Sequence, residues 1–195
     1  SQGHVAYPDR AANPIPLLMK LMLALSDTAL DAGYERFQPS SLQTTDIHVG
    51  NSAPNVIPSE ATARFNIRFN PNWTGATLDS WLRATLDRAA EPIGASYSLK
   101  TVVSGEAFLT EDERFLGLVA DASERRLGKR PALSTTGGTS DARFIKDYAP
   151  VVEFGLLAKT IHQINEGAPV ADILALADIY SDILAAYFAQ GSAMR

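Results

Sequence analysis

A strict alternation of apolar and polar side chains runs along residues 61–69. Apolar residues stand at every second position and polar residues fill the positions between them: Ala61, Ala63, Phe65, Ile67 and Phe69 against Thr62, Arg64, Asn66 and Arg68. Successive side chains of a strand point to opposite faces of a sheet. The pattern therefore predicts a strand with one buried face and one solvated face.

Two helices and further strands are predicted around this segment. Leucines at helical spacing follow two prolines that suit a first helical turn, and short alternating runs recur elsewhere. The expected elements are helices over residues 13–30 and 77–90, strands over residues 41–49 and 96–103, and the end of a first strand around Val5. The order β-α-β-β-α-β is typical of a ferredoxin-like, split βαβ domain of the α+β class.

A change of pattern after Gly105 predicts two domains, residues 1–105 and residues 106–195. Helices and short strands alternate in the second part, as in an α/β layer. We expect helices over residues 111–127, 140–147 and 170–189, and strands over residues 132–135 and 151–154. Two short strands do not make a complete sheet, and the first residue is Ser1. We therefore expect a piece of a longer protein.

The composition narrows the class of protein. Hydrophobic residues make up 46% and charged residues 20% of the chain, as in folded domains, so a disordered chain is not expected. The chain has no cysteine, which excludes a disulfide scaffold and leaves histidine and carboxylate as metal ligands. The net charge of −5 argues against nucleic acid as a partner. The longest apolar run stops at Lys20, so no membrane span is expected, and we expect a soluble, cytoplasmic protein.

The three histidines differ in their surroundings. His4 precedes a Tyr7-Pro8 corner in a loop-like start, where its ring could face a ligand, whereas His48 lies in a predicted strand and carries no functional hypothesis. His162 lies in a polar loop before the last helix. Loops that follow strands in α/β sheets are common ligand sites, although a lone histidine is more often a surface residue.

A glycine-rich stretch over residues 135–143 has two interpretations. Gly138, Thr139 and Ser140 at a helix start could expose backbone N–H groups to an anion, with Arg143 adding a carboxylate contact. The same residues could form an ordinary helix cap, and both interpretations stay open. Arg68 lies on the polar strand face and Asn55 in a turn, where a solvated arginine and a turn asparagine are the default expectations.

Four motifs taken together resemble the M20 family of metallopeptidases: residues 3–8, residues 55–58, residues 137–144 and residues 160–166. They occur in the family's order and cover the C-terminal half or so of such a protein. The resemblance implies a ferredoxin-like dimerisation (lid) domain followed by the C-terminal piece of a zinc-peptidase-like α/β catalytic domain. It also implies a homodimer formed through residues 1–105.

The resemblance also implies site residues. His162 would be a metal ligand, and His4 would reach the partner's site to stabilise the oxyanion. The substrate-binding set would be Tyr7, Asn55, Arg68, Gly138, Thr139, Ser140 and Arg143. Members of the family hold two zinc ions, with cobalt as a substitute, and their upstream ligands and general base have no counterpart here. We therefore expect this piece not to hold both ions and to be inactive by itself.

The implied reaction is metal-dependent hydrolysis of an amide in a small substrate with carboxylates at both ends. Two alternatives stay open. The protein could be another M20 amidohydrolase, such as an aminoacylase or a carboxypeptidase. It could also be a dimerisation module without catalytic function.

Overall fold

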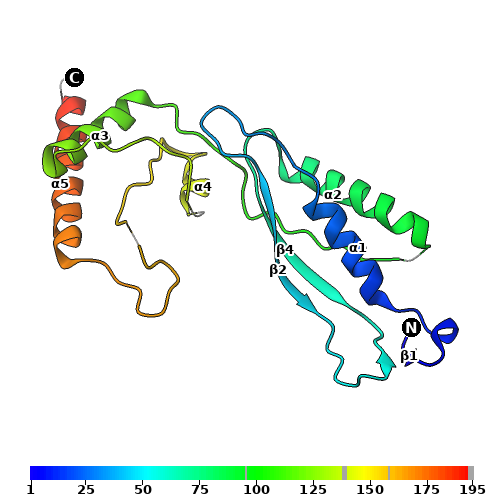
Figure 1. Ribbon diagram of the computed structural model, residues 1–195. Coiled ribbons are helices and arrows are strands. Elements are labelled where there is room, and N and C mark those ends of the chain that lie inside the picture. Colours follow the sequence, from blue (N-terminus) through cyan, green and yellow to red (C-terminus); the bar gives the residue numbers. More distant parts are fainter. Residues whose placement is uncertain (95, 138–139, 158, 193–195) are drawn as a thin grey trace. The chain divides into compact units, whose positions relative to one another are not determined.

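The computed structural model describes residues 1–94, 96–137, 140–157 and 159–192 (Figure 1). The chain divides into two compact units, Ser1–Ala107 and Phe108–Arg195. A compact unit need not be a domain that folds by itself, so the domain boundary expected after Gly105 stays a prediction. The two units are described in turn.

An antiparallel ladder of two strands is the centre of the first unit. Strand β2 (Ser41–His48) pairs with β4 (Thr62–Arg68), from Ser41 opposite Arg68 to His48 opposite Thr62. One irregularity in the register lies between Thr44 and Asp46. The strands expected over residues 41–49 and 61–69 are therefore confirmed, and the alternation along β4 appears as half-buried and exposed residues in turn.

Two helices cover one face of this ladder (Figure 1). Helix α1 (Pro14–Ser26) begins where Asn13 Oδ1 accepts the N–H of Ile15, and α2 (Gly75–Ala90) begins with a capping box between Thr74 and Thr77. Such caps satisfy N–H groups that have no partner within the helix. The buried core consists of Leu21, Leu25, Leu82, Leu86 and Ala90, with Leu42, Phe65 and Ile67 of the strands packed against it.

A second, shorter sheet lies at one end of the ladder. Strand β1 (Gly3–His4) pairs antiparallel with β3 (Val56–Ile57), a strand that the sequence pattern did not predict. Two short 3-10 helices, η1 (Pro8–Arg10) and η2 (Glu91–Ile93), follow β1 and α2. The β1–β3 pair brings the beginning of the chain to the segment that connects β2 to β4.

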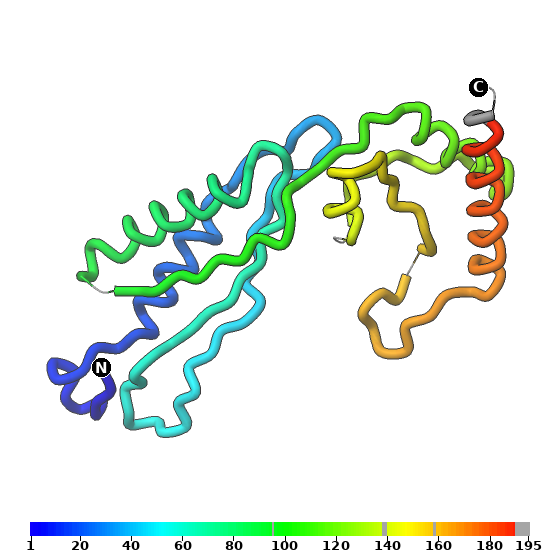
Figure 2. The backbone as a smooth tube through the Cα atoms, turned by 180° about the vertical axis from the view of Figure 1, so that it is seen from behind, coloured from blue at the N-terminus to red at the C-terminus, as the bar shows by residue number. Residues whose placement is uncertain are grey.

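The strand expected over residues 96–103 is wrong, because none of its described residues is part of a ladder. The segment is nevertheless extended and runs along the first unit (Figure 2). Tyr97 and Leu99 pack against the core, and Tyr97 and Thr101 donate hydrogen bonds to Asp87 and Asp79 of α2. The alternating pattern therefore indicated correctly that Tyr97 and Leu99 face the core. Side-chain hydrogen bonds to α2 are formed in place of the backbone pairing expected of a strand.

The second unit is built on α3 (Glu113–Leu127), α4 (Ala142–Ile145) and α5 (Val170–Ser192). Helices α3 and α5 pack together, and the Arg126 guanidinium donates two hydrogen bonds to the Asp182 carboxylate. All three helices were expected, although α4 is shorter. The strands expected over residues 132–135 and 151–154 are wrong, because the described part of this unit supplies no paired neighbour for them.

None of the described helices combines the length and the apolar character needed to cross a bilayer.

Candidate functional site

Three of the predicted site residues lie together at the β1–β3 end of the first unit. His4 pairs with Val56, and the N–H of Val5 donates to the carbonyl oxygen of Asn55 at 3.1 Å. The rings of His4 and Tyr7 lie 6.0 Å apart, centre to centre. The short sheet therefore brings His4, Tyr7 and Asn55 together across about 50 residues of sequence.

The ring of His4 is held by its own loop. The N–H of Ala6 donates to Nδ1 at 3.1 Å, and the N–H of Tyr7 donates to the carbonyl oxygen of His4 at 2.9 Å. A neutral imidazole has one N–H donor and one acceptor nitrogen. Because Nδ1 accepts, the neutral ring carries its proton on Nε2, and this exposed side chain presents a hydrogen-bond donor to its surroundings.

Tyr7 contributes an accessible aromatic face beside a positive charge. Its side chain is 57% exposed, and the Arg10 guanidinium lies 5.1 Å from the centre of its ring. A cation over an aromatic ring is attracted by the negative face of that ring. The β1–β3 end of the unit therefore offers a hydrogen-bond donor, an aromatic ring and a guanidinium close together.

Arg68 lies at the opposite end of the ladder, as the last residue of β4 and opposite Ser41. Its side chain is exposed, and it takes part in an interaction with another residue. A strand rises about 3.3 Å per residue, so about 20 Å of β4 separates Arg68 from Thr62. Thr62 pairs with His48 just before the segment that leads to Asn55, so Arg68 and the His4 group lie far apart in one chain.

The sequence had not indicated Asp31, whose carboxylate lies near Arg68's end of the ladder. Oδ1 accepts N–H groups from Gly33 at 2.8 Å, Ser40 at 3.1 Å and Asn70 at 2.7 Å, and Oδ2 accepts Trp73 Nε1–H at 3.0 Å. Burial opposes ionisation of this carboxyl, but hydrogen bonds from Ser40, Gly33 and Asn70 outweigh it and lower its pKa from 3.8 to about 2. The aspartate-x-glycine spacing, typical of an Asx turn, was its one local signal.

In the second unit, Gly138 and Thr139 lie outside the described residues. Ser140 Oγ accepts the N–H of Ala142 at 3.0 Å and donates to the Glu153 carboxylate. Arg143 lies in α4 with its guanidinium 4.7 Å from the centre of the Phe144 ring. Its Nε is enclosed and has no hydrogen-bond partner among the residues that the structure describes.

His162 lies at a turn with a left-handed backbone, φ = 60°. Its N–H donates to Glu166 Oε2 at 3.2 Å, and Thr160 Oγ1 accepts the N–H of Gly167 at 3.1 Å, so hydrogen bonds close the loop. Within the described ranges, no group of three or more histidine, aspartate or glutamate side chains comes together to hold a metal ion. By themselves, these residues do not fit a dinuclear zinc centre.

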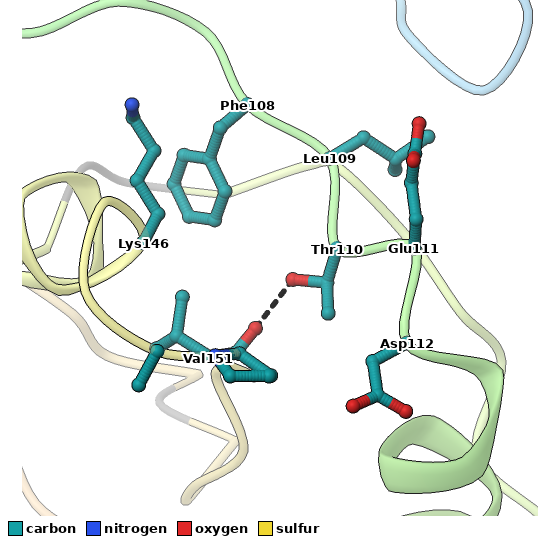
Figure 3. A pocket seen from close by; sticks show the side chains of 9 residues that line it. Phe108, Leu109, Thr110, Glu111, Asp112, Lys146 and Val151 are labelled. Carbon is teal, nitrogen blue, oxygen red and sulfur yellow. Dashed lines mark hydrogen bonds between the residues drawn. The ribbon is translucent and has the colours of Figure 1, made fainter.

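A hollow of about 300 Å³ also lies in the second unit (Figure 3). Two of its charged side chains have partners nearby, since Asp112 caps α3 by accepting the N–H of Phe115 and Lys146 Nζ lies 2.5 Å from the Asp147 carboxylate. The Thr110 hydroxyl donates to the carbonyl oxygen of Val151 across it. None of the predicted site residues lines this hollow.

Comparison with known proteins finds one matching family model. Residues 1–93 match the peptidase dimerisation domain of M20 proteins. The first unit therefore resembles that domain. The chain is 53% identical over 97% of its length to a succinyl-diaminopimelate desuccinylase of Parvibaculum lavamentivorans, covering 48% of that protein. It is 54% identical over 96% of its length to the same enzyme of Phenylobacterium zucineum, covering 50% of that protein.

The chain thus spans about half the length of the curated relatives that it matches. Two solved structures share the fold of this chain over 94% of its length. One is a tripeptidase of Staphylococcus aureus, with a TM-score of 0.74 at 21% identity and 48% of that chain covered. The other is an M20 metallo-carboxypeptidase of Sulfolobus solfataricus, with a TM-score of 0.68 at 13% identity and 54% covered.

The resemblance expected from the four motifs is therefore confirmed, and the fold is that of M20 peptidases with a mixed α+β composition. The matched family model is that of a dimerisation domain. The roles of the individual site residues stay predictions.

Proposed function

We propose that this chain is part of a succinyl-diaminopimelate desuccinylase. The enzyme would hydrolyse N-succinyl-L,L-2,6-diaminopimelate to succinate and L,L-diaminopimelate, a step of lysine biosynthesis. The observation that carries the proposal is the identity of 53% over 97% of the chain to a desuccinylase. The chain covers about half of such a protein, so the proposal concerns the longer polypeptide.

His4 is proposed to stabilise the oxyanion that develops on the scissile amide. The bond from the Ala6 N–H to Nδ1 supports this role, because it leaves Nε2–H as the donor of a neutral ring. A donor already aimed at the developing charge needs no reorganisation during the reaction. Loss of one such donor lowers kcat by about 100- to 1,000-fold in other hydrolases.

His4 and Arg68 are proposed to serve different substrate molecules. They lie at opposite ends of the β2–β4 ladder, about 20 Å of strand apart. The scissile amide and the nearer carboxylate of a succinylated substrate are separated by only a few bonds. The distance therefore supports a homodimer, formed through residues 1–105, in which His4, Tyr7 and Asn55 act in the partner's site.

The proposed dimerisation domain is ferredoxin-like, with residues 96–103 in the place of a fourth strand. Two helices on one face of an antiparallel ladder and the order α1-β2-β4-α2 support it, although β1 pairs with β3 in a separate sheet. Light scattering of the 195-residue chain is expected to give twice the mass of one chain. A monomer at working concentrations would contradict the dimer.

Residues of the second unit are proposed to bind substrate and metal. The guanidinium of Arg143 in α4 supports a carboxylate contact, since guanidinium and carboxylate form paired hydrogen bonds. Gly138, Thr139 and Ser140 complete the proposed loop, and His162 is the proposed metal ligand. The two zinc ions, or cobalt, would need ligands beyond the described residues. We accordingly expect no turnover by the 195 residues alone.

The test is a substrate panel with the complete protein that contains this chain. We expect succinylated diaminopimelate to be hydrolysed with a higher kcat/KM than N-acetyl amino acids or peptides. A preference for an acylated amino acid or a peptide would favour an aminoacylase or a carboxypeptidase instead. A dimer with zinc added and no turnover of any substrate would favour the non-catalytic module.

His4→Ala is the decisive variant within that assay. We expect kcat to fall about 100- to 1,000-fold. His48→Ala is the matched control, because His48 ends β2 in the same unit and has no proposed role in the reaction. Equal losses in both variants would contradict the role of His4.

A further inference from the structure

The ladder of the first unit has one closed end and one open end. The segment that joins β2 to β4 lies at the end where His48 pairs with Thr62. At the other end Ser41 begins β2 and Arg68 ends β4, and no short turn joins them. Strand ends without a connecting turn open locally at low cost. Arg68, the proposed carboxylate ligand, lies at the end that needs another constraint.

Hydrogen bonds to Asp31 supply that constraint. Its carboxylate accepts four N–H groups, from Gly33, Ser40, Asn70 and Trp73, at 2.7–3.1 Å. Ser40 directly precedes β2, and Asn70 follows the last residue of β4 by two positions. One side chain from the α1–β2 connection therefore holds both strands at their open end.

Asn70 closes the same end directly. Its backbone N–H donates to Ser40 Oγ at 3.1 Å, its Nδ2 donates also to the carbonyl oxygen of Gln38 at 3.1 Å, and its Oδ1 accepts the N–H of Asn72 at 2.9 Å. Asn70 is only 1% exposed. A buried amide with these partners has little freedom to shift, because each lost bond would leave a buried polar group unsatisfied.

We propose that Asp31 is a positioning residue for Arg68, because it holds the backbone N–H of Ser40 before β2 and the side chain of Asn70 just after β4. The contact between Arg68 and a substrate rests on the proposed function. The positioning of Arg68 by Asp31 does not depend on it. A long arginine side chain reaches a fixed point only when its Cα is held. The role needs a carboxylate, because four N–H donors require a group that only accepts. Asparagine at position 31 would turn an NH₂ group toward one of these donors.

The first test uses the 195-residue chain and does not depend on activity. The Nε–Hε resonances of the arginines would be recorded for the wild type and Asp31→Asn, and assigned with Arg68→Lys and Arg64→Lys. We expect Asp31→Asn to shift or broaden the Arg68 signal and to leave Arg64 unchanged. Arg64 is the internal reference, since it lies on the same exposed face of β4, four residues earlier.

Asp46→Asn is the matched control. Asp46 is an exposed carboxylate on the same ladder, opposite Arg64. This variant should disturb Arg64 and leave Arg68 unchanged. If Asp31→Asn does not fold, Ser40→Ala removes the hydroxyl that accepts the Asn70 N–H and hydrogen-bonds Asp31, but it keeps the four N–H bonds to the carboxylate and should shift Arg68 less. An unchanged Arg68 signal in the folded variant, or equal changes at both arginines, would overturn the proposal.

The second test separates positioning from general structural damage in the complete enzyme. Asp31→Asn should raise KM for the succinylated substrate about tenfold and change kcat less than about twofold, the pattern of weakened binding. His4→Ala should lower kcat instead. A lowered kcat with unchanged KM in Asp31→Asn would overturn the inference. If the complete wild-type protein had no desuccinylase activity, only the proposed function would be overturned. The arginine Nε–Hε resonances of the 195-residue chain would still test whether Asp31 positions Arg68.

Discussion

Acidification should weaken the first unit through Asp31. The pKa of this carboxyl falls from 3.8 to about 2 in the folded chain, because hydrogen bonds from Ser40, Gly33 and Asn70 outweigh the effect of burial. A difference of nearly two pKa units, at about 1.4 kcal/mol each, corresponds to at most about 2.5 kcal/mol. Solvent screening at a half-buried carboxylate lowers the contribution to about 1–2 kcal/mol.

The direction of this pH dependence follows from which state, folded or unfolded, binds the proton of Asp31 more tightly. Because the folded pKa is the lower one, the unfolded chain takes up the proton first as the pH falls. The contribution is therefore fully present above about pH 5 and is lost between pH 3.8 and about pH 2. Asp31→Asn has no such carboxyl, so the difference in unfolding free energy between the wild type and this variant should shrink over that window.

Urea unfolding followed by tryptophan fluorescence measures this difference. Trp73 donates to Asp31 and lies 6.2 Å from Trp81, ring centre to ring centre, and these two are the chain's tryptophans, so the signal reports the first unit. Asp46→Asn, the control, should keep the pH dependence of the wild type. A difference between the wild type and Asp31→Asn that is equal at pH 6 and pH 2.5 would refute the reasoning.

Two further predictions follow from local geometry. Gly75→Ala should destabilise the first unit by about 1–3 kcal/mol in thermal unfolding, because the added Cβ would lie 2.5 Å from Val103 Cγ2. Adding Val103→Ala should restore part of this loss. Gly117→Ala in α3 is the control and should not destabilise the chain, because its Cβ would meet nothing within 4 Å. Long-range ¹H–¹⁵N spectra at pH 8 should show His4 protonated at Nε2, because Nδ1 accepts the Ala6 N–H; a proton on Nδ1 would contradict this geometry.

Local periodicity was sufficient for the helices and the central ladder. The stripe of leucines in α1 and the alternation in β4 each describe one buried face, which a short window of sequence already contains. The three wrong strands, over residues 96–103, 132–135 and 151–154, share one cause. A strand exists only when a neighbour accepts its backbone hydrogen bonds, and a window of sequence does not contain that neighbour.

The sequence by itself indicated the resemblance to M20 peptidases, the core helices and the residues that we propose for substrate binding. Only the tertiary structure decided which of them meet. The β1–β3 pairing brings Asn55 to His4, the Ala6 N–H selects the tautomer of His4, and the ladder separates both from Arg68. No sequence pattern linked Asp31 with Asn70. The hydrogen bond between them joins two segments, 39 residues apart, that become neighbours only when the core forms.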